Sequence, residues 1–369
     1  MKIVAQVSRV LVGALFIFSG LIKLNDPVGT AIKMDEYFGV FANDFAPFFA
    51  AFKPFALEFA MLVVVLEVVL GVAVLLNYKM NLTAWVLLLL IGFFTFLTFY
   101  SAWFNKVTDC GCFGDAIKLT PWQSFTKDVI LLFFVGIIFF FRNQYKAVLP
   151  GLPGHLSMGG VTALSIFVGI YAIQHLPYFD FRAYKVGTDI EAAMNPSEEL
   201  KYKYVMEKDG QTFEFAEYPS EPGYEYKDYV LLNPEAQAKI TDYSVWNNEG
   251  DFTEQTFTGN KLVVIVHDSD KADGDSFKEI NALVEKLPAN VEAMVFTATG
   301  EKKFEIFRHE HQIAMPYYFA DATVLKAVIR SNPGIVLMQE GVVQGKWHHN
   351  DVPGISQISN RLQQGIAKR

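Results

Sequence analysis

The residues best suited to chemistry in this chain are Cys110 and Cys112, which make up its whole cysteine content. They lie in the short polar stretch Asp109-Cys110-Gly111-Cys112-Phe113-Gly114-Asp115. A thiol pair can take two electrons from a partner's thiols and pass them on. A disulfide across so small a ring departs from relaxed geometry, so we expect it to be oxidising, with Gly111 supplying the backbone freedom to close it. The two cysteines are the candidate catalytic residues.

Other interpretations of the pair stay open. It could be a structural disulfide, two reduced loop thiols, or half of a metal site. Two cysteines cannot complete the four-ligand shell of a structural zinc, and no histidine lies near them in the sequence. We therefore expect no metal, and access to the thiolate decides between the remaining alternatives.

The elements that position the cysteines are predicted to be membrane helices. Hydrophobic residues make up 52% of the chain, and the excess lies before residue 178, in runs that approach the bilayer-spanning length of about 20 residues. Five spans are expected, at roughly 5–23, 55–77, 82–104, 122–141 and 158–176. The cysteine loop then joins the third and fourth spans. Segment 24–54 suits an amphipathic helix at the outer interface.

Basic residues near the helix ends predict the orientation. Arg9, Lys79, Arg142 and Lys146 mark the cytoplasmic side. With five spans, the N-terminus is cytoplasmic in a bacterial inner membrane, and the cysteine loop and the chain after residue 178 are periplasmic, where disulfides persist. Membrane lipid is thus an expected partner, and the net charge of −8 argues against nucleic acid.

Ionisable residues inside the spans form a second candidate site. Such residues are costly in a bilayer and usually face a partner or a functional pathway. We expect Glu67 to pair with Arg9, while the others lie near the outer helix ends. The alternative is that these charges pair only to orient helices. The candidate cofactor pocket, with a quinone as the cofactor considered, comprises Lys23, Glu58, Glu67, Lys127 and Asp128.

The polar tail divides in two. Residues 178–254 are predicted to form an extended, partly β connector, with a hairpin of 201–206 and 212–215 around Asp209-Gly210. Strands are then expected at 261–267, 291–297, near 317, at 334–339 and at 342–347, with helices at 276–287, 302–311 and 323–330. His348 and His349 are expected to point to opposite faces and to lie in a solvated turn.

The order of elements after residue 255 resembles a thioredoxin fold. Pro333 falls where that family places its cis-proline, before a strand. The loop that would carry C-x-x-C runs instead from His267 to Gly274 without a thiol, so this degenerate domain cannot itself exchange dithiols. Candidate partner-binding residues around this position are His267, Asp268, Asp270 and Pro333.

The membrane half resembles the DoxX and MauE-like family of four-helix membrane proteins. The matching residues are Arg9-x3-Gly13, Ser19-Gly20-x2-Lys23, Asp26-Pro27, Glu58, Glu67-x3-Gly71 and the cysteine loop. The resemblance implies a four-helix domain over 1–145. A fifth helix and a long tail depart from a minimal member of that family, and the domains expected after residue 145 are a loop and fifth helix over 146–177, the connector over 178–254 and the thioredoxin-like domain over 255–369. It also implies a role in maturing disulfide-containing periplasmic proteins, in a layout similar to that of quinone-coupled thiol oxidoreductases.

The fold class expected is therefore an α-helical membrane bundle followed by a soluble α/β thioredoxin-like domain. The function expected is a membrane thiol-disulfide redox or maturation factor for exported proteins, coupled to quinone and built on Cys110 and Cys112. As an enzyme it would be a thiol/quinone oxidoreductase. The alternatives are a non-catalytic assembly or scaffold subunit whose tail binds a partner and, third, an oxidase of sulfur compounds.

Overall fold

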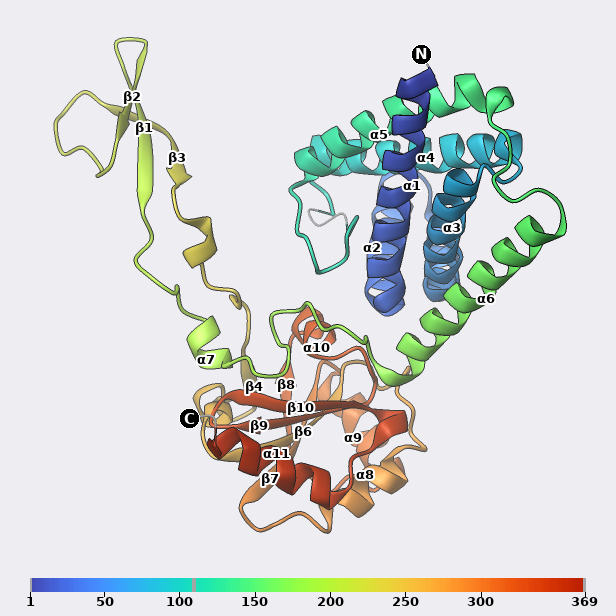
Figure 1. The fold of residues 1–369 in the computed structure, drawn as a ribbon. Helices are drawn as coiled ribbons and strands as arrows, with labels where there is room; N and C mark the ends of the chain where they lie inside the picture. Colours follow the sequence, from blue (N-terminus) through green and yellow to red (C-terminus); the bar gives the residue numbers. More distant parts are fainter. Residues whose placement is uncertain (1, 108–110, 368–369) are drawn as a thin grey trace. The chain divides into compact units, whose positions relative to one another are not determined.

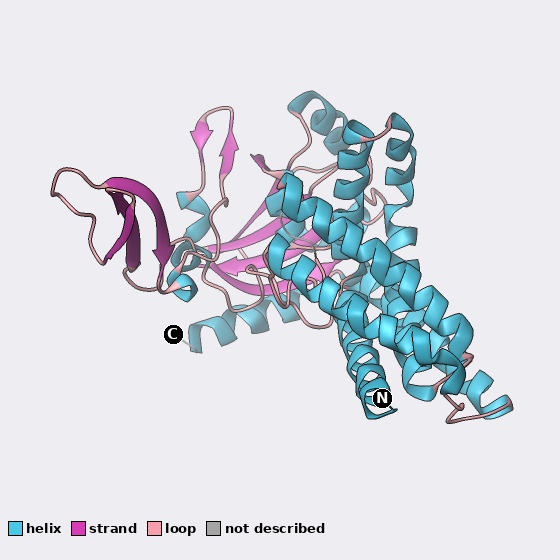
Figure 2. Cartoon of the chain, turned by 90° about the horizontal axis from the view of Figure 1, so that it is seen from above, coloured by secondary structure: helices cyan, strands magenta, loops and turns pink. Residues whose placement is uncertain are grey.

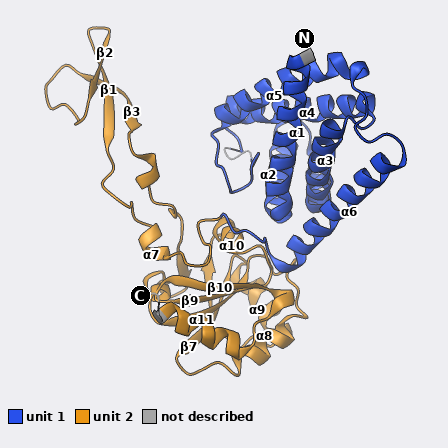
Figure 3. Cartoon of the chain, viewed as in Figure 1, with its two compact units in different colours: residues 1–181 blue, residues 182–369 orange. Residues whose placement is uncertain are grey.

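The computed structural model describes residues 2–107 and 111–367 of the chain. The chain forms two compact units, unit 1 from Met1 to Phe181 and unit 2 from Arg182 to Arg369 (Figure 3). Unit 1 is built from helices, whereas unit 2 combines strands with shorter helices (Figure 1).

Five helices in the described part of the chain are long and apolar enough to cross a membrane, as predicted. They are α1 (Lys2–Asn25), α3 (Ala56–Leu76), α4 (Met80–Phe104), α5 (Pro121–Phe141) and α6 (Leu152–His175). α6 begins earlier than the sequence suggests because Pro153 is tolerated in the first turn of a helix. Beyond α6, Asn25 and Phe179 exchange two hydrogen bonds of 2.8 and 2.9 Å, which hold the departing chain at the end of α1.

The segment expected to be an amphipathic helix forms α2 (Pro27–Asp44), followed by the 3-10 helix η1 (Pro47–Phe55). Asp26 caps α2 by accepting a hydrogen bond of 2.8 Å from the Gly29 amide. The buried ring of Phe41 contacts that of Tyr100 on α4 edge-on, at 5.5 Å. This contact packs α2 against the C-terminal part of α4.

Glycines bring α1 and α3 into close contact. A Cβ added to Gly71 would lie 2.8 Å from the carbonyl oxygen of Gly13, and one added to Gly20 would lie 3.0 Å from the amide of Val68. Small residues permit such backbone approach between membrane helices. We call these contacts the glycine seam, and they place the last turns of α1 against the middle of α3.

The register of the seam corrects one expectation. Arg9 does not pair with Glu67, because the antiparallel helices bring it to the C-terminal end of α3. There its Nη1 donates to the Leu75 carbonyl and to Asn77 Oδ1, both at 2.9 Å. The partner of Glu67 is instead Lys23, near the other end of α1.

Unit 2 contains a seven-stranded sheet in the order β10-β9-β6-β7-β8-β4-β5, drawn in magenta in Figure 2. Strand β6, in the interior of the sheet, is parallel to β7 and antiparallel to β9. The strands are β4 (Val245–Asn247), β5 (Gly250–Asp251), β6 (Asn260–Val266), β7 (Val291–Thr297), β8 (Tyr317–Ala320), β9 (Gly334–Gln339) and β10 (Val342–His348). The connections are those of a thioredoxin-like fold, as predicted, although β4 and β5 are shorter than the sequence pattern can indicate.

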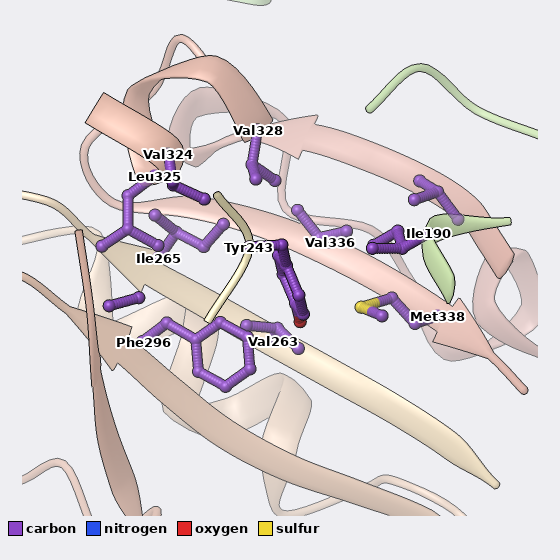
Figure 4. Close-up of a pocket in the computed structure, with 12 residues that line it drawn as sticks. Ile190, Tyr243, Val263, Ile265, Phe296, Val324, Leu325, Val328, Val336 and Met338 are labelled. Carbon is purple, nitrogen blue, oxygen red and sulfur yellow. The ribbon is translucent and has the colours of Figure 1, made fainter. Parts of the chain in front are cut away.

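Alternating side chains of β6 form two cores. Leu262 and Val264 face the core made with α8 (Phe277–Val284), α9 (Glu301–Glu310) and α11 (Ile355–Ala367). Val263 and Ile265 face the other side, covered by α7 (Ile190–Ala193) and α10 (Ala322–Val328). A cavity of about 10 Å³ remains there, with Tyr243 among the residues that line it (Figure 4). It has room for about one water and an apolar lining, so it belongs to the core.

A separate three-stranded sheet precedes these strands, in the order β2-β1-β3. It comprises β1 (Tyr202–Lys208), β2 (Gln211–Phe215) and β3 (Glu225–Leu231). The β1-β2 pair is the predicted hairpin, and Asp209 and Gly210 both take positive φ in its turn. Strand β3 was not predicted, because its charged residues and the register shift between its residues Asp228 and Tyr226 obscure the alternation of a strand.

Candidate functional site

The loop between α4 and α5 carries the cysteines. Cys110 lies outside the described residues, while Cys112 is described and is disulfide-bonded. Gly111 and Gly114 take positive φ, and the Gly114 amide donates to the Gly111 carbonyl at 3.0 Å. The loop therefore turns tightly where glycine is needed.

Ser19 connects this loop to a buried ion pair. Its Oγ lies 2.9 Å from the carbonyl oxygen of Cys112 and 3.0 Å from Glu67 Oε2, so its one proton can be donated to either. Lys23 Nζ lies 2.5 Å from Glu67 Oε1. Lys23 and Glu67 are 8% and 2% exposed, so each depends on the other for charge compensation. Lys23 Nζ also lies 5.2 Å from the centre of the Phe94 ring.

A second polar cluster lies on α5 and α4. Asp128 is 1% exposed, and its carboxylate receives a hydrogen bond of 3.0 Å from Thr98 and one of 2.5 Å from Lys127. Lys127 Nζ lies 5.4 Å from the ring centre of Phe113, the residue after Cys112. The same loop thus contacts both clusters, through Ser19 on one side and Lys127 on the other.

The structure brings Lys23 to Glu67 and Lys127 to Asp128, but not all five predicted pocket residues together. Glu58 is exposed in the first turn of α3. It is nine residues from Glu67, a rise of about 13 Å along the helix.

Sequence reasoning missed Thr98 and Ser124 as members of the site. Ser124 is fully buried one turn before Asp128, and its Oγ has no hydrogen-bond partner among the described residues. Serine and threonine are common in membrane helices, so composition gave no signal. The i, i+4 spacing of Ser124 to Asp128 could have indicated a shared face.

In unit 2, the predicted partner-binding residues lie around the end of β6. The Asn332–Pro333 peptide bond is cis, as the sequence indicates. The Asn332 side chain donates to the Asp268 carbonyl at 2.7 Å, so the loop after β6 is joined to the loop that contains Pro333. Asp270 is exposed and pairs with Lys303 on α9.

His267 directly follows the last residue of β6, and its buried Nδ1 has no hydrogen-bond partner in the described chain. Burial, and then the positive charge of Lys326, lower the pKa of His267 to about 4. The imidazole is therefore neutral at pH 7. An uncharged, partly buried histidine thus stands at the start of a loop that contains no cysteine.

The expectation for His348 and His349 is wrong. β10 ends at His348, and His349 begins a 3-10 turn, so the two rings do not alternate but lie 4.0 Å apart. His348 is buried. His349 Nδ1 lies 3.0 Å from Ser331 Oγ, and its Nε2 lies 3.5 Å from Asp273. His349 therefore holds the loop that contains Pro333, and the buried His348 does not sit in a solvated turn.

In unit 1, a loop with the disulfide-bonded Cys112 thus lies on a helical bundle that contains buried ion pairs. Residues 1–141 of unit 1 form a MauE-like membrane domain, since the family described as methylamine utilisation protein MauE matches them. Unit 2 is thioredoxin-like by its own strand order and connections.

Particular proteins are similar to parts of the chain. Protein TlpB of Flavobacterium psychrophilum is 28% identical over 141 residues, which cover 37% of this chain and 36% of TlpB. The chain thus matches about a third of the length of that relative. A thiol peroxidase from Chromobacterium violaceum is similar in structure, with 18% identity, a TM-score of 0.26, and coverage of 34% of this chain and 84% of the peroxidase.

Proposed function

We propose that this protein is a membrane thiol-disulfide redox or maturation factor for exported proteins, with Cys110 and Cys112 as the exchanging pair and a membrane quinone as the electron acceptor. In this proposal it is a thiol/quinone oxidoreductase of the bacterial inner membrane. Unit 2 lies in the periplasm and holds the client or a partner protein.

One observation carries the proposal: the backbone of Cys112 is bonded by the hydroxyl that also reaches the Lys23–Glu67 pair. A permanent staple in a surface loop needs no such connection to buried ionisable groups. Thiol oxidation releases protons, and Ser19 lies where it can exchange a hydrogen bond between the loop and Glu67. The contact therefore supports a loop whose redox change is linked to charges in the bundle.

In the exchange step, the electrons and protons that the client loses are all taken up by the cysteine pair. A client thiolate attacks one sulfur of the Cys110–Cys112 disulfide and forms a mixed disulfide, which releases the other cysteine as a thiol. The client's second thiol then attacks the client sulfur of the mixed disulfide and releases the remaining cysteine of the pair. The client gains a disulfide, and the pair gains two electrons and two protons. Cys112 is partly exposed, which is compatible with attack from outside.

The residues of the second cluster fit a quinone. Ser124 supplies a buried hydroxyl that lacks a partner, and a quinone carbonyl is an acceptor that it could satisfy. Asp128 and Lys127 lie one turn further along α5, and Phe113 offers a ring beside Lys127. A bound quinone would supply a two-electron, two-proton acceptor. Ser124 and Lys127 would orient it beside the cysteine loop.

The test is to trap the redox state of the cysteines in intact cells with a membrane-impermeant alkylating reagent, with and without prior reduction. We expect the pair to be reachable from outside and to shift toward the dithiol when the quinone pool is held reduced. A pair that stays oxidised and resists mild reductant under both conditions would overturn the redox function.

A matched pair of variants tests the quinone contact. Ser124→Ala should slow reoxidation of the pair by added quinone three- to tenfold, the effect of losing about one hydrogen bond. Its thermal stability should not fall, since the hydroxyl has no partner to lose. Ser8→Ala removes another fully buried hydroxyl and should leave reoxidation unchanged. Equal rates for both variants would remove Ser124 from the site.

A second candidate function is a non-catalytic scaffold whose unit 2 binds a partner. The observation that favours it is the exposed aromatic surface of the three-stranded sheet, together with the absence of cysteine from unit 2. Under this alternative the disulfide is permanent. Trapping would then find it oxidised in every condition.

A further inference from the structure

The three-stranded sheet β2-β1-β3 has two chemically different faces. Paired residues of neighbouring strands share a face, and successive residues alternate. In β3 a register shift between Asp228 and Tyr226 adds one residue, so that Tyr226 and Tyr229 lie on the same face. Tyr204 lies opposite Phe215 and Tyr229, and Met206 lies opposite Tyr226. This aromatic face contrasts with a charged face, on which Val205 lies opposite Asp228 and Glu207 opposite Glu225. We call residues 198–233 the aromatic arm.

Part of the aromatic face is already covered by the arm itself. Tyr224, in the loop between β2 and β3, contacts Phe215 edge-on at a ring distance of 5.0 Å. Met206 is consequently 1% exposed. Tyr226 and Tyr229 on β3 remain 50% and 52% exposed. The uncovered portion of the aromatic face therefore lies along β3.

β3 is also an edge strand, since the sheet order places β1 on one side of it and no strand on the other within the described residues. Exposed edges present backbone donors and acceptors that can pair with an added strand. The first six of its seven residues are exposed. Nothing in this sheet therefore covers the β3 edge, and two tyrosines flank it on one face.

The charge of the arm selects the partner. Residues 198–233 hold nine acidic and four basic residues, a formal charge of −5. Lys203 pairs with Glu214 and Lys227 with Glu207. Glu225 and Asp228 stay exposed on the charged face of β3, and Asp228 accepts a hydrogen bond of 2.8 Å from the Tyr229 amide, which holds its carboxylate at this edge. A cation already lies on one ring of the arm, where Lys208 Nζ is 4.6 Å from the centre of Tyr224.

We propose that β3 is a docking edge for an extended segment of a partner protein in which basic residues alternate with apolar or aromatic ones. The segment adds to the sheet as a strand. Its basic side chains lie beside Glu225 and Asp228 on the charged face, and its apolar side chains lie beside Tyr226 and Tyr229 on the aromatic face. This proposal rests on the aromatic arm alone and is independent of the redox chemistry of unit 1.

The experiment uses two labelled ten-residue peptides, one alternating Arg with Val and one alternating Glu with Val, and the full-length protein in nanodiscs of zwitterionic lipid. Fluorescence anisotropy should show binding of the Arg peptide and at least tenfold weaker binding of the Glu peptide. A copy of the Arg peptide methylated on alternate backbone nitrogens should bind at least tenfold more weakly, because those amides would pair with β3.

Charge reversal separates a specific edge from general attraction. Glu225→Lys with Asp228→Lys should reverse the preference, so that the Glu peptide binds more tightly. The control is Asp275→Lys with Glu279→Lys, which makes the same change in net charge at exposed positions of unit 2 outside the arm. The control should keep the preference for the Arg peptide.

Three results would overturn the proposal. One is equal binding of the two peptides, and another is a loss in the control variant as large as that in the β3 variant. The third is self-association of the protein that the β3 reversal abolishes, since the edge would then serve a second copy of this chain. Far-ultraviolet circular dichroism of each variant checks that the sheet is retained.

Discussion

Lys23 and Glu67 form an ion pair in a nearly dry environment. Removing water from two ions is expensive, and their attraction offsets the cost only while both are present. The hydroxyl of Ser19 supplies a further hydrogen bond to Glu67. The intact pair therefore adds little net stability, whereas the loss of one partner should lower the stability of unit 1 strongly.

Replacing Glu67 with Gln should destabilise unit 1 by about 3–5 kcal/mol, the usual effect of leaving a buried charge without its partner. Replacing Lys23 with Met in the same chain should recover part of that loss. Thermal unfolding in detergent measures both effects. Glu58→Gln, at an exposed position of the same helix, is the control and should change stability little. Equal effects at positions 58 and 67 would contradict the pairing.

The lowered pKa of His267 predicts how the stability of unit 2 depends on pH. Its pKa is near 4 in the folded chain and near 6.5 in the unfolded one, so the unfolded chain binds the extra proton. Stability is therefore complete above about pH 6.5 and is lost as the pH falls toward 4. Lys326, Lys271 and Arg330 add to the effect, and Asp268 opposes it.

The measurement is the unfolding midpoint in denaturant across that pH range, with tryptophan fluorescence as the signal. His267→Gln should flatten the dependence. His309→Gln changes an exposed histidine of α9 and should preserve it. His349, whose pKa burial also lowers, should leave a smaller residual slope.

At the scale of elements, the glycine seam decides whether the site exists. Ser19 and Lys23 reach Glu67 only because α1 and α3 approach to backbone contact at Gly13, Gly20 and Gly71. The two helix patterns Arg9-x3-Gly13 and Glu67-x3-Gly71 thus have a physical reason, since each pairs a functional residue with the small residue that seats its helix.

Gly71→Ala should separate α1 from α3, because its Cβ would meet the Gly13 carbonyl and the Ile17 amide at 2.8 and 2.9 Å. We expect a loss of stability and easier reduction of the cysteine loop, measured by the rate of thiol labelling after mild reductant. Gly92→Ala and Gly136→Ala add a methyl where nothing lies within 4 Å. These controls should stabilise their helices by about 0.5–1 kcal/mol.

Long apolar runs made the five spans predictable, and strong alternation did the same for β6, β7 and β9. The pairing of charges was not predictable in the same way. Arg9 and Lys23 are both cations on α1, and only the register of the glycine seam gives Glu67 to Lys23. Ser124 and His349 were missed or misjudged because their roles depend on neighbours distant in sequence, which spacing along one element does not reveal.

At the scale of the whole molecule, two contacts mark one end of unit 1. Cys112 lies against Ser19, Asn25 ends α1, and Phe179 is bonded to Asn25. The contacts of Arg9, Asn77 and Lys146 mark the opposite end. The exit of the chain toward unit 2 and the cysteine loop therefore share an end of the bundle.

Protease added to sealed vesicles should cleave unit 2 in the same preparations in which an impermeant maleimide labels the reduced cysteines. Right-side-out and inverted vesicles supply the two cases. Cleavage of unit 2 in vesicles whose cysteines are shielded would contradict the shared end.

The two hydrogen bonds between Asn25 and Phe179 have a consequence for a chain that inserts into the membrane in the wrong orientation. A chain inserted with the opposite orientation would carry its cysteine loop and the start of unit 2 together to the other side of the membrane. A chain with only some of its spans inverted would lose both hydrogen bonds, because they join the end of α1 to the residues just beyond α6. Errors of insertion should thus reverse both features together.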